Sequence, residues 1–215
     1  FKESKGYIMF IRIHDFVPKT RALGPEERFA IWFQGCNRMC KGCMSPETRN
    51  VKSGHLIETE DIYNYILQQK SIEGITISGG EPFLQIDGLY ELLAKICKRT
   101  TLGVMLYTGY TVTELRKLGN DRIDEILDSY VDILIDGQYI DELNDGINLR
   151  GSSNQNVIFL TDRYKGYRDL FNKKGRNVEI YATPKNVVMV GVPTKTTLQE
   201  WHKITAKDGQ CELSV

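Results

Sequence analysis

The stretch that decides the fold is FAIWFQGCNRMCKGC, residues 29–43. Its first five residues, Phe29–Phe33, form an unbroken apolar run, which is typical of a parallel strand buried on both faces. Three cysteines follow with C-x3-C-x2-C spacing, namely Cys36, Cys40 and Cys43. Loops at the carboxyl ends of parallel strands carry the chemistry of α/β folds. The stretch therefore predicts a site built from three thiols at one edge of an α/β sheet.

The chemistry of three thiolates leaves two kinds of site open. Thiolates are the ligands of iron–sulfur clusters, and three of them on four irons leave one iron free to bind another molecule. The alternative is a structural zinc site with His55 as its fourth ligand, although zinc sites more often use paired C-x2-C units. Only Cys97 and Cys211 remain elsewhere, which is too few for a second cluster. An odd number of cysteines also argues against a secreted disulfide scaffold.

Bulk composition excludes several classes of protein. The chain has 215 residues, enough for one sizeable core, with 28 basic and 28 acidic side chains. A nucleic-acid-binding protein usually carries a basic excess, which is missing here. The sequence also contains no apolar run long enough to span a bilayer and no signal-peptide pattern. We therefore expect no nucleic-acid or membrane partner and a cytoplasmic location.

Short apolar runs recur along the chain and alternate with helical patterns. Further strands are expected at Ile75–Ser78, Val104–Tyr107, Ile133–Ile135 and Val157–Phe159. The first helical pattern follows a predicted cap at Thr59, and the second covers Gly88–Arg99. The third follows a Thr111/Glu114 capping box, and the fourth covers Asp121–Tyr130. This alternation predicts βαβ units and a parallel sheet. Because about five units are too few for a closed eight-fold barrel, the expected fold is a partial (β/α) barrel.

The two ends of the chain depart from this repeat. Tyr7–Ile13 reads as an extra N-terminal strand, followed by a loop through Pro18. Near the other end, the runs 178–181 and 187–190 flank Thr183-Pro184-Lys185-Asn186 and predict a β-hairpin. We therefore divide the chain into a core, residues 7–162, and a C-terminal appendage, residues 163–215, packed on that core.

A second motif follows the strand at Ile75–Ser78. Gly79-Gly80-Glu81-Pro82 would let a ligand approach the main chain closely, because glycines carry no Cβ atom. Carbonyls together with a carboxylate suit an amino group. Taken alone, the motif is more simply interpreted as an ordinary turn.

Later strand ends carry weaker candidates. Thr108 ends the third strand, and Asp136 and Gln138 follow the fourth. Asp136 would either accept hydrogen bonds from ribose hydroxyls or cap a turn, and Gln138 would bind a carboxylate or hydroxyl. Arg150 suits an anionic group, although a solvated loop residue is the simpler interpretation.

These motifs, in this order, resemble the activating enzymes of anaerobic ribonucleotide reductase. That group belongs to the glycyl-radical-enzyme activases of the radical S-adenosylmethionine (SAM) superfamily. The segments that carry the similarity are Gly24-Pro25, Cys36–Cys43, Gly79–Pro82, Tyr107–Thr111, Asp132–Gln138 and Arg150–Gln155. It extends over roughly residues 7–160. Two departures are Gly42, where many superfamily members have an aromatic residue, and the longer segment after Arg163.

The resemblance implies an activity, its cofactors and its partners. Cys36, Cys40 and Cys43 would hold one [4Fe–4S] cluster, and Gly79, Gly80 and Glu81 would contact the methionine part of SAM. Thr108 and Asp136 would lie at strand-end positions that related activases use to bind SAM. Reductive cleavage of SAM, with an electron donor such as flavodoxin, would yield a 5′-deoxyadenosyl radical that abstracts hydrogen from a glycine of a partner enzyme. Alternatives are a radical SAM enzyme that modifies a peptide or small molecule, and a non-catalytic zinc-binding protein.

Overall fold

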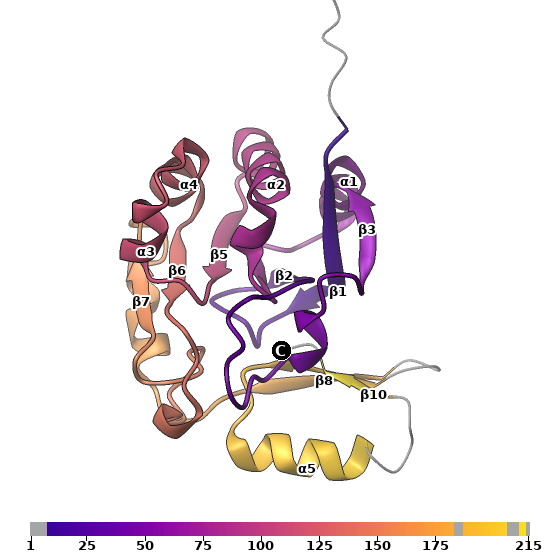
Figure 1. Cartoon of the computed structure of the whole chain (residues 1–215), viewed down its shortest axis with the longest axis vertical. Helices are drawn as coiled ribbons and strands as arrows, with labels where there is room; N and C mark the ends of the chain where they lie inside the picture. The colour runs from indigo at the N-terminus through magenta and orange to yellow at the C-terminus, as the bar shows by residue number, and fades with distance from the viewer. Residues whose placement is uncertain (1–7, 183–186, 206–210, 214–215) are drawn as a thin grey trace, which may run out of the picture.

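The computed structural model describes residues 8–182, 187–205 and 211–213, and it places a mixed sheet at the centre of an α/β fold. The sheet has seven strands in the order β3-β1-β2-β4-β5-β6-β7 (Figure 1). Its strands are β1 (Phe10–Thr20), β2 (Arg28–Phe33), β3 (His55–Glu58), β4 (Gly74–Gly79), β5 (Gly103–Tyr107), β6 (Ile133–Asp136) and β7 (Asn156–Phe159). The α/β class expected from the sequence is confirmed.

The centre of the sheet is parallel, as expected. Strands β2, β4, β5 and β6 pair in parallel, with Ile31 opposite Ile77 and Ile77 opposite Leu106. All six residues of β2 are buried, which explains its unbroken apolar run. Because the four carboxyl ends lie at one edge, the loops that follow them meet there.

The outer strands of the sheet differ from the sequence prediction in direction and in length. Strand β7 pairs antiparallel with β6, because the chain between them contains no crossover helix and returns directly. Strand β1 continues through Pro18 to Thr20, where a loop was predicted. Its register shifts between Val17 and Thr20, which accommodates a residue without a backbone N–H. Tyr7, the predicted start of this strand, lies outside the described residues.

Helices cover one face of the sheet. They are α1 (Thr59–Gln68), α2 (Ile86–Arg99), α3 (Val112–Lys117) and α4 (Asp121–Glu125), and α4 runs on into a π-helical turn at Ile126–Tyr130. Ile31, Ile77 and Leu106 pack in the same core as helical Ile66 and Leu92. The predicted helices are confirmed, including the capping box at Thr111. Thr59 is the first helical residue rather than the cap, which is Glu58.

The opposite face packs against the C-terminal segment. Strands β8 (Val178–Ala182) and β9 (Val187–Gly191) pair antiparallel, as expected for a hairpin, and β10 (Cys211–Leu213) pairs parallel with β9. The predicted turn at 183–186 lies outside the described residues. Helix α5 (Lys195–Thr205) packs beside this small sheet (Figure 1). Trp32 of β2 shares an apolar cluster with Val190 of β9.

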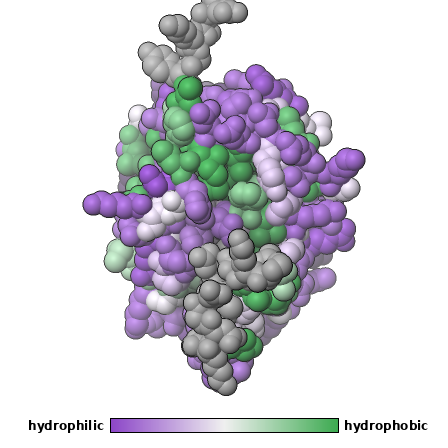
Figure 2. All heavy atoms as spheres, turned by 90° about the vertical axis from the view of Figure 1, so that its right-hand side faces the viewer, coloured by the Kyte–Doolittle hydropathy of each residue, from purple (hydrophilic) through white to green (hydrophobic). Residues whose placement is uncertain are grey.

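The edge strand β3 was not predicted, because its four residues carry too weak a pattern. Its outer side presents apolar groups, with Leu56 57% and neighbouring Phe10 44% exposed. Figure 2 views the molecule from this side and shows apolar surface next to charged surface. Among the described residues, no helix is both long and apolar enough to cross a membrane.

Candidate active site

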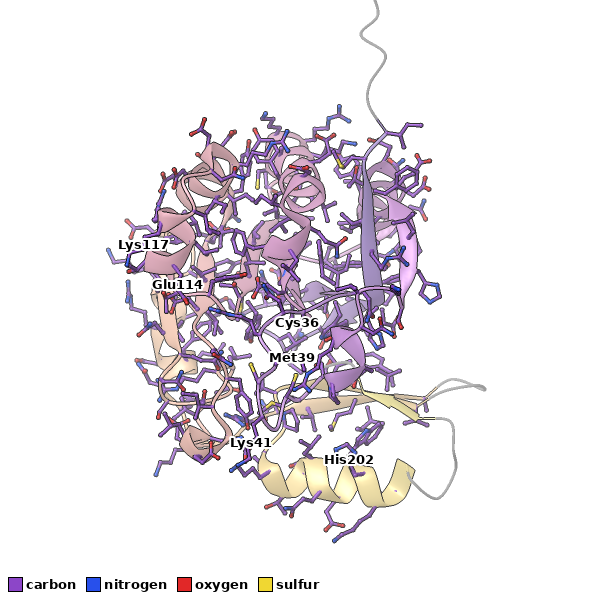
Figure 3. The ribbon with its side chains drawn as sticks, in the orientation of Figure 1. Cys36, Met39, Lys41, Glu114, Lys117 and His202 are labelled. Carbon is purple, nitrogen blue, oxygen red and sulfur yellow. The ribbon has the colours of Figure 1, made fainter. Side chains whose placement is uncertain are left out.

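One pocket lies at the carboxyl ends of β2, β4 and β5 and gathers most of the predicted site residues. The predicted residues that line it are Cys36, Cys40, Cys43, Gly79, Gly80, Glu81 and Thr108. Figure 3 shows Cys36 and Met39 in the loop between the main sheet and the C-terminal segment. The parallel register of the strands brings these loops together although they are far apart in the sequence.

Asp136 lies outside the lining of this pocket. Its Oδ2 accepts a hydrogen bond from the backbone N–H of Val112, the first residue of α3, at 2.8 Å. Its Oδ1 accepts another from Asn156 Nδ2, also at 2.8 Å. The two carboxylate oxygens thus bind the first residue of α3 and the neighbouring strand β7, and neither bond caps the turn at Gly137.

Pro82, Gln138 and Arg150 also lie outside the lining. Pro82 is buried at the start of a short 3₁₀ helix. Gln138 Nε2 donates to the backbone carbonyl of Arg38 at 3.0 Å, so it fastens the cysteine loop to the loop after β6. Arg150 forms an ion pair with Asp145.

The three thiols provide the donor set for a cluster. All three are free and partly buried, and burial raises the pKa of Cys36 and of Cys43. Among the described residues, no three His, Cys, Asp or Glu side chains converge on one metal ion. Thiolates that hold a cubane each bind a different iron, so they surround a volume rather than meet at a point. A donor set of three separate thiols around one pocket therefore fits a [4Fe–4S] cluster.

The zinc alternative lacks its proposed fourth ligand. His55 lies exposed on the edge strand β3, where it pairs with Ile13, and is absent from the pocket lining.

The glycine pair is required by its surroundings. Gly79 has φ +108°, and a Cβ atom there would lie 2.4 Å from the backbone of Phe33. A Cβ atom on Gly80 would lie 2.1 Å from the carbonyl oxygen of Gly35. The amide N–H groups of Gly80 and Glu81 donate to the carbonyls of Phe33 and Gly35, both at 2.8 Å. This loop is therefore fastened directly to the segment that leads into Cys36.

Glu81 is a fully buried carboxylate that links three parts of the site. It accepts hydrogen bonds from Thr108 Oγ1 at 2.8 Å, from the Gly109 N–H at 2.8 Å and from the Phe83 N–H at 3.1 Å. Burial raises the pKa of Glu81 to about 7, although these bonds oppose the increase. Because the carboxylate is committed to protein donors, it holds the end of β5 against the end of β4.

Sequence reasoning missed several residues of the pocket. Tyr139 and Arg49 line it, and Arg38 also reaches the loop after β5, donating to the Gly109 carbonyl from Nε at 2.8 Å. Tyr139 is held by its hydroxyl, which donates to Asp141 at 2.7 Å. One sequence signal could have indicated the position of Arg49. Ser45-Pro46 is a helix-start pattern, and the short helix that it begins, Pro46–Arg49, brings Arg49 back to the cysteines.

Comparison with known proteins identifies the family. The family described as a 4Fe-4S single cluster domain matches residues 22–158, more than half of the chain. The chain belongs to this family. The cluster expected from the cysteines is thereby confirmed as a cofactor of the chain.

Individual relatives of this 4Fe-4S single cluster protein carry names that agree with the sequence resemblance. The anaerobic ribonucleoside-triphosphate reductase-activating protein of Vibrio cholerae is 33% identical over 150 residues, which cover 66% of this chain and 94% of that protein. The phage T4 protein of the same name is 30% identical over 65% of this chain and 88% of its own length. The pyruvate formate-lyase-activating enzyme of Clostridium pasteurianum is 28% identical over 88% of this chain and 72% of its own length. The predicted resemblance to the radical SAM activases is confirmed.

Proposed function

We propose that this chain is a radical SAM activase that generates a glycyl radical in a partner enzyme, such as an anaerobic ribonucleotide reductase. The observation that carries the proposal is the shared pocket of three thiols and the Gly79–Glu81 loop. The names of the relatives support it, since they activate a ribonucleotide reductase or pyruvate formate-lyase.

In this proposal some residues of the pocket bind the cluster, some bind SAM and others position the strand ends. Cys36, Cys40 and Cys43 hold the cluster. When bound, the cluster and SAM supply the radical chemistry that removes hydrogen from a glycine. The backbone of Gly79 and Gly80, which lines the pocket beside the cysteines, meets the methionine end of SAM. Glu81 and Thr108 fix the adjoining strand ends through their hydrogen bond.

The proposal extends to the architecture and to the electron donor. We interpret the main sheet with its helices as a partial (β/α) barrel over residues 7–162, and residues 163–215 as the appendage packed on it. A small redox protein such as flavodoxin delivers the electron in the cytoplasm. The contact between Trp32 and the β9 cluster supports the packing of the appendage on the core.

The decisive experiment uses the chain reconstituted with iron and sulfide without oxygen. With SAM and a reductant we expect 5′-deoxyadenosine by chromatography. With a glycyl radical enzyme encoded in the same genome we expect a glycyl radical signal by electron paramagnetic resonance (EPR). Formation of 5′-deoxyadenosine without a radical on that partner would favour a peptide or small-molecule substrate. A protein that purifies with zinc and takes up no cluster would contradict the proposal.

A further inference from the structure

Arg49 occupies an unusual position relative to the three cysteines. It ends the 3₁₀ helix Pro46–Arg49, which follows Cys43 after two residues. The turn is fixed by buried Thr48, whose Oγ1 donates to the Ser45 carbonyl at 2.7 Å. The Thr48 carbonyl in turn accepts the N–H of Gly35 at 2.7 Å. Arg49 is thereby carried back to the segment that begins the cysteine loop.

Arg49 then contacts two of the three predicted ligands and lines a pocket with the third. The backbone carbonyl of Arg49 accepts the N–H of Cys36 at 3.1 Å. Its Nη2 donates to the backbone carbonyl of Cys40. Its side chain lines the same pocket as Cys43. The two hydrogen bonds join the beginning and the middle of the cysteine loop, so they fix Cys36 relative to Cys40.

The charge of Arg49 also matters at this place. The side chain is partly buried and lines the pocket, where water screens charge less than at the surface. A cluster held by three thiolates gains negative charge when it is reduced. Nearby positive charge and hydrogen bonds to sulfur favour the reduced form, because both stabilise the added electron.

The second arginine of the region does not share this arrangement. Arg38 forms an ion pair with Glu114 at 2.9 Å and lies over the Tyr110 ring, 4.0 Å from its centroid. Its guanidinium is therefore directed to the loop after β5 and to helix α3.

We propose that Arg49 is a positioning residue for the [4Fe–4S] cluster, which holds the cysteine loop in place and raises the reduction potential of the cluster by its charge. This inference rests on the proposed function, in which Cys36, Cys40 and Cys43 are the ligands.

The test compares Arg49→Gln, which removes the charge, with Arg49→Lys, which keeps it. Arg122→Gln on helix α4 is the matched control, because that helix lies away from the cysteine loop (Figure 1). An EPR-monitored redox titration of each reconstituted protein gives the midpoint potential. At a fixed potential we expect Arg49→Gln to show about a tenfold lower ratio of reduced to oxidised cluster, which is about 59 mV for one electron. Arg49→Lys and Arg122→Gln should match the wild type.

A second measurement does not need the cluster. Hydrogen–deuterium exchange of residues 36–43 in the cluster-free chain should be at least about fivefold faster in Arg49→Gln than in the wild type, since the loop loses the side-chain contact of Arg49 with the Cys40 carbonyl. Unchanged exchange, or equal shifts of potential in the Lys and Gln variants, would overturn the inference. Failure of the wild type itself to take up iron and sulfide would instead contradict the proposed function.

Discussion

Gly42 shows how a single residue of the cysteine loop depends on a distant segment. It has φ +69°, and a Cβ atom there would lie 3.0 Å from the side chain of Asp141. Many radical SAM proteins have an aromatic residue at the corresponding position. Here Asp141 fills that space, and Tyr139 supplies an aromatic ring to the pocket from the loop after β6.

Replacing one predicted ligand should abolish cluster binding. In Cys43→Ser the hydroxyl is a poor ligand for iron, so we expect loss of nearly all bound iron and sulfide after reconstitution. Cys97→Ser is the matched control, because Cys97 lies on α2, where its thiol contacts the Tyr130 carbonyl. Iron and sulfide assays with absorbance spectra give the comparison. A Cys43→Ser protein with full cluster content would refute the assignment.

Glu81 should make the cluster-free protein less stable as the pH rises. Its pKa is about 7 in the folded chain, against 4.5 for an ordinary glutamate, so between these values the folded state keeps a proton that the unfolded state loses. The contribution of Glu81 to stability is therefore fully retained below pH 4.5 and declines up to pH 7, by about 3 kcal/mol in total. Urea unfolding across this range should show the decline in the wild type and a flatter profile in Glu81→Gln.

The exposed Glu200→Gln on helix α5 provides the control for that series, since the Glu200 side chain is 59% exposed and we expect the variant to show the same decline as the wild type. Identical slopes in the wild type and Glu81→Gln would show that Glu81 titrates normally.

At the scale of elements, helix α3 depends on its first turn. Thr111 Oγ1 accepts the N–H of Glu114 at 3.2 Å, and the Glu114 carboxylate accepts the N–H of Thr111 at 2.7 Å. Loss of this capping box in Thr111→Ala should lower the free energy of unfolding by about 1 kcal/mol. Thr113→Ala, an exposed position in the same helix, should cost nothing. Chemical denaturation of both variants measures the two free energies of unfolding. Equal values for Thr111→Ala and Thr113→Ala would show that the capping box does not stabilise the helix.

The elements that sequence reasoning found share a strong local signal. Buried strands such as Phe29–Phe33 are apolar on both faces, and helix α3 begins with a complete capping box. Strand β3 and the direction of β7 were missed, because a short edge strand and an antiparallel return depend on neighbours rather than on local pattern. The same limit applies to the site. The cysteines and the glycine pair stand out as motifs, whereas Tyr139 reaches the pocket through tertiary packing and Arg49 through the turn at Pro46–Arg49.

At the scale of the whole molecule, Arg28 joins the strands at the end opposite the site. It is fully buried, and all its N–H groups donate hydrogen bonds. Nε donates to Thr76 Oγ1, and Nη1 donates to the Pro25 carbonyl and to Tyr164 Oη. Nη2 donates to the carbonyls of Ile75 and Gly103. This arrangement connects β2, β4 and β5 with the segment after β7.

Arg28→Met should therefore destabilise the fold strongly. The substitution leaves several buried acceptors without donors, so we expect a loss of about 3 kcal/mol or more. Arg21→Met, at a side chain that is 72% exposed, should change stability by less than about 0.5 kcal/mol. Thermal or urea unfolding distinguishes the two. A small effect at Arg28 would mean that water replaces its hydrogen bonds.

Met44, the residue after Cys43, packs against apolar clusters that contain Trp32, Val190 and Trp201. Loss of the Trp201 side chain would loosen this packing beside Cys43 and would let dioxygen approach the thiols. We expect Trp201→Ala to shorten the lifetime of the loaded enzyme in air severalfold, visible as faster bleaching of its brown colour, while exposed His202→Ala bleaches at the wild-type rate. Tolerance of oxygen would then be a property of the C-terminal helix as much as of the cysteines themselves.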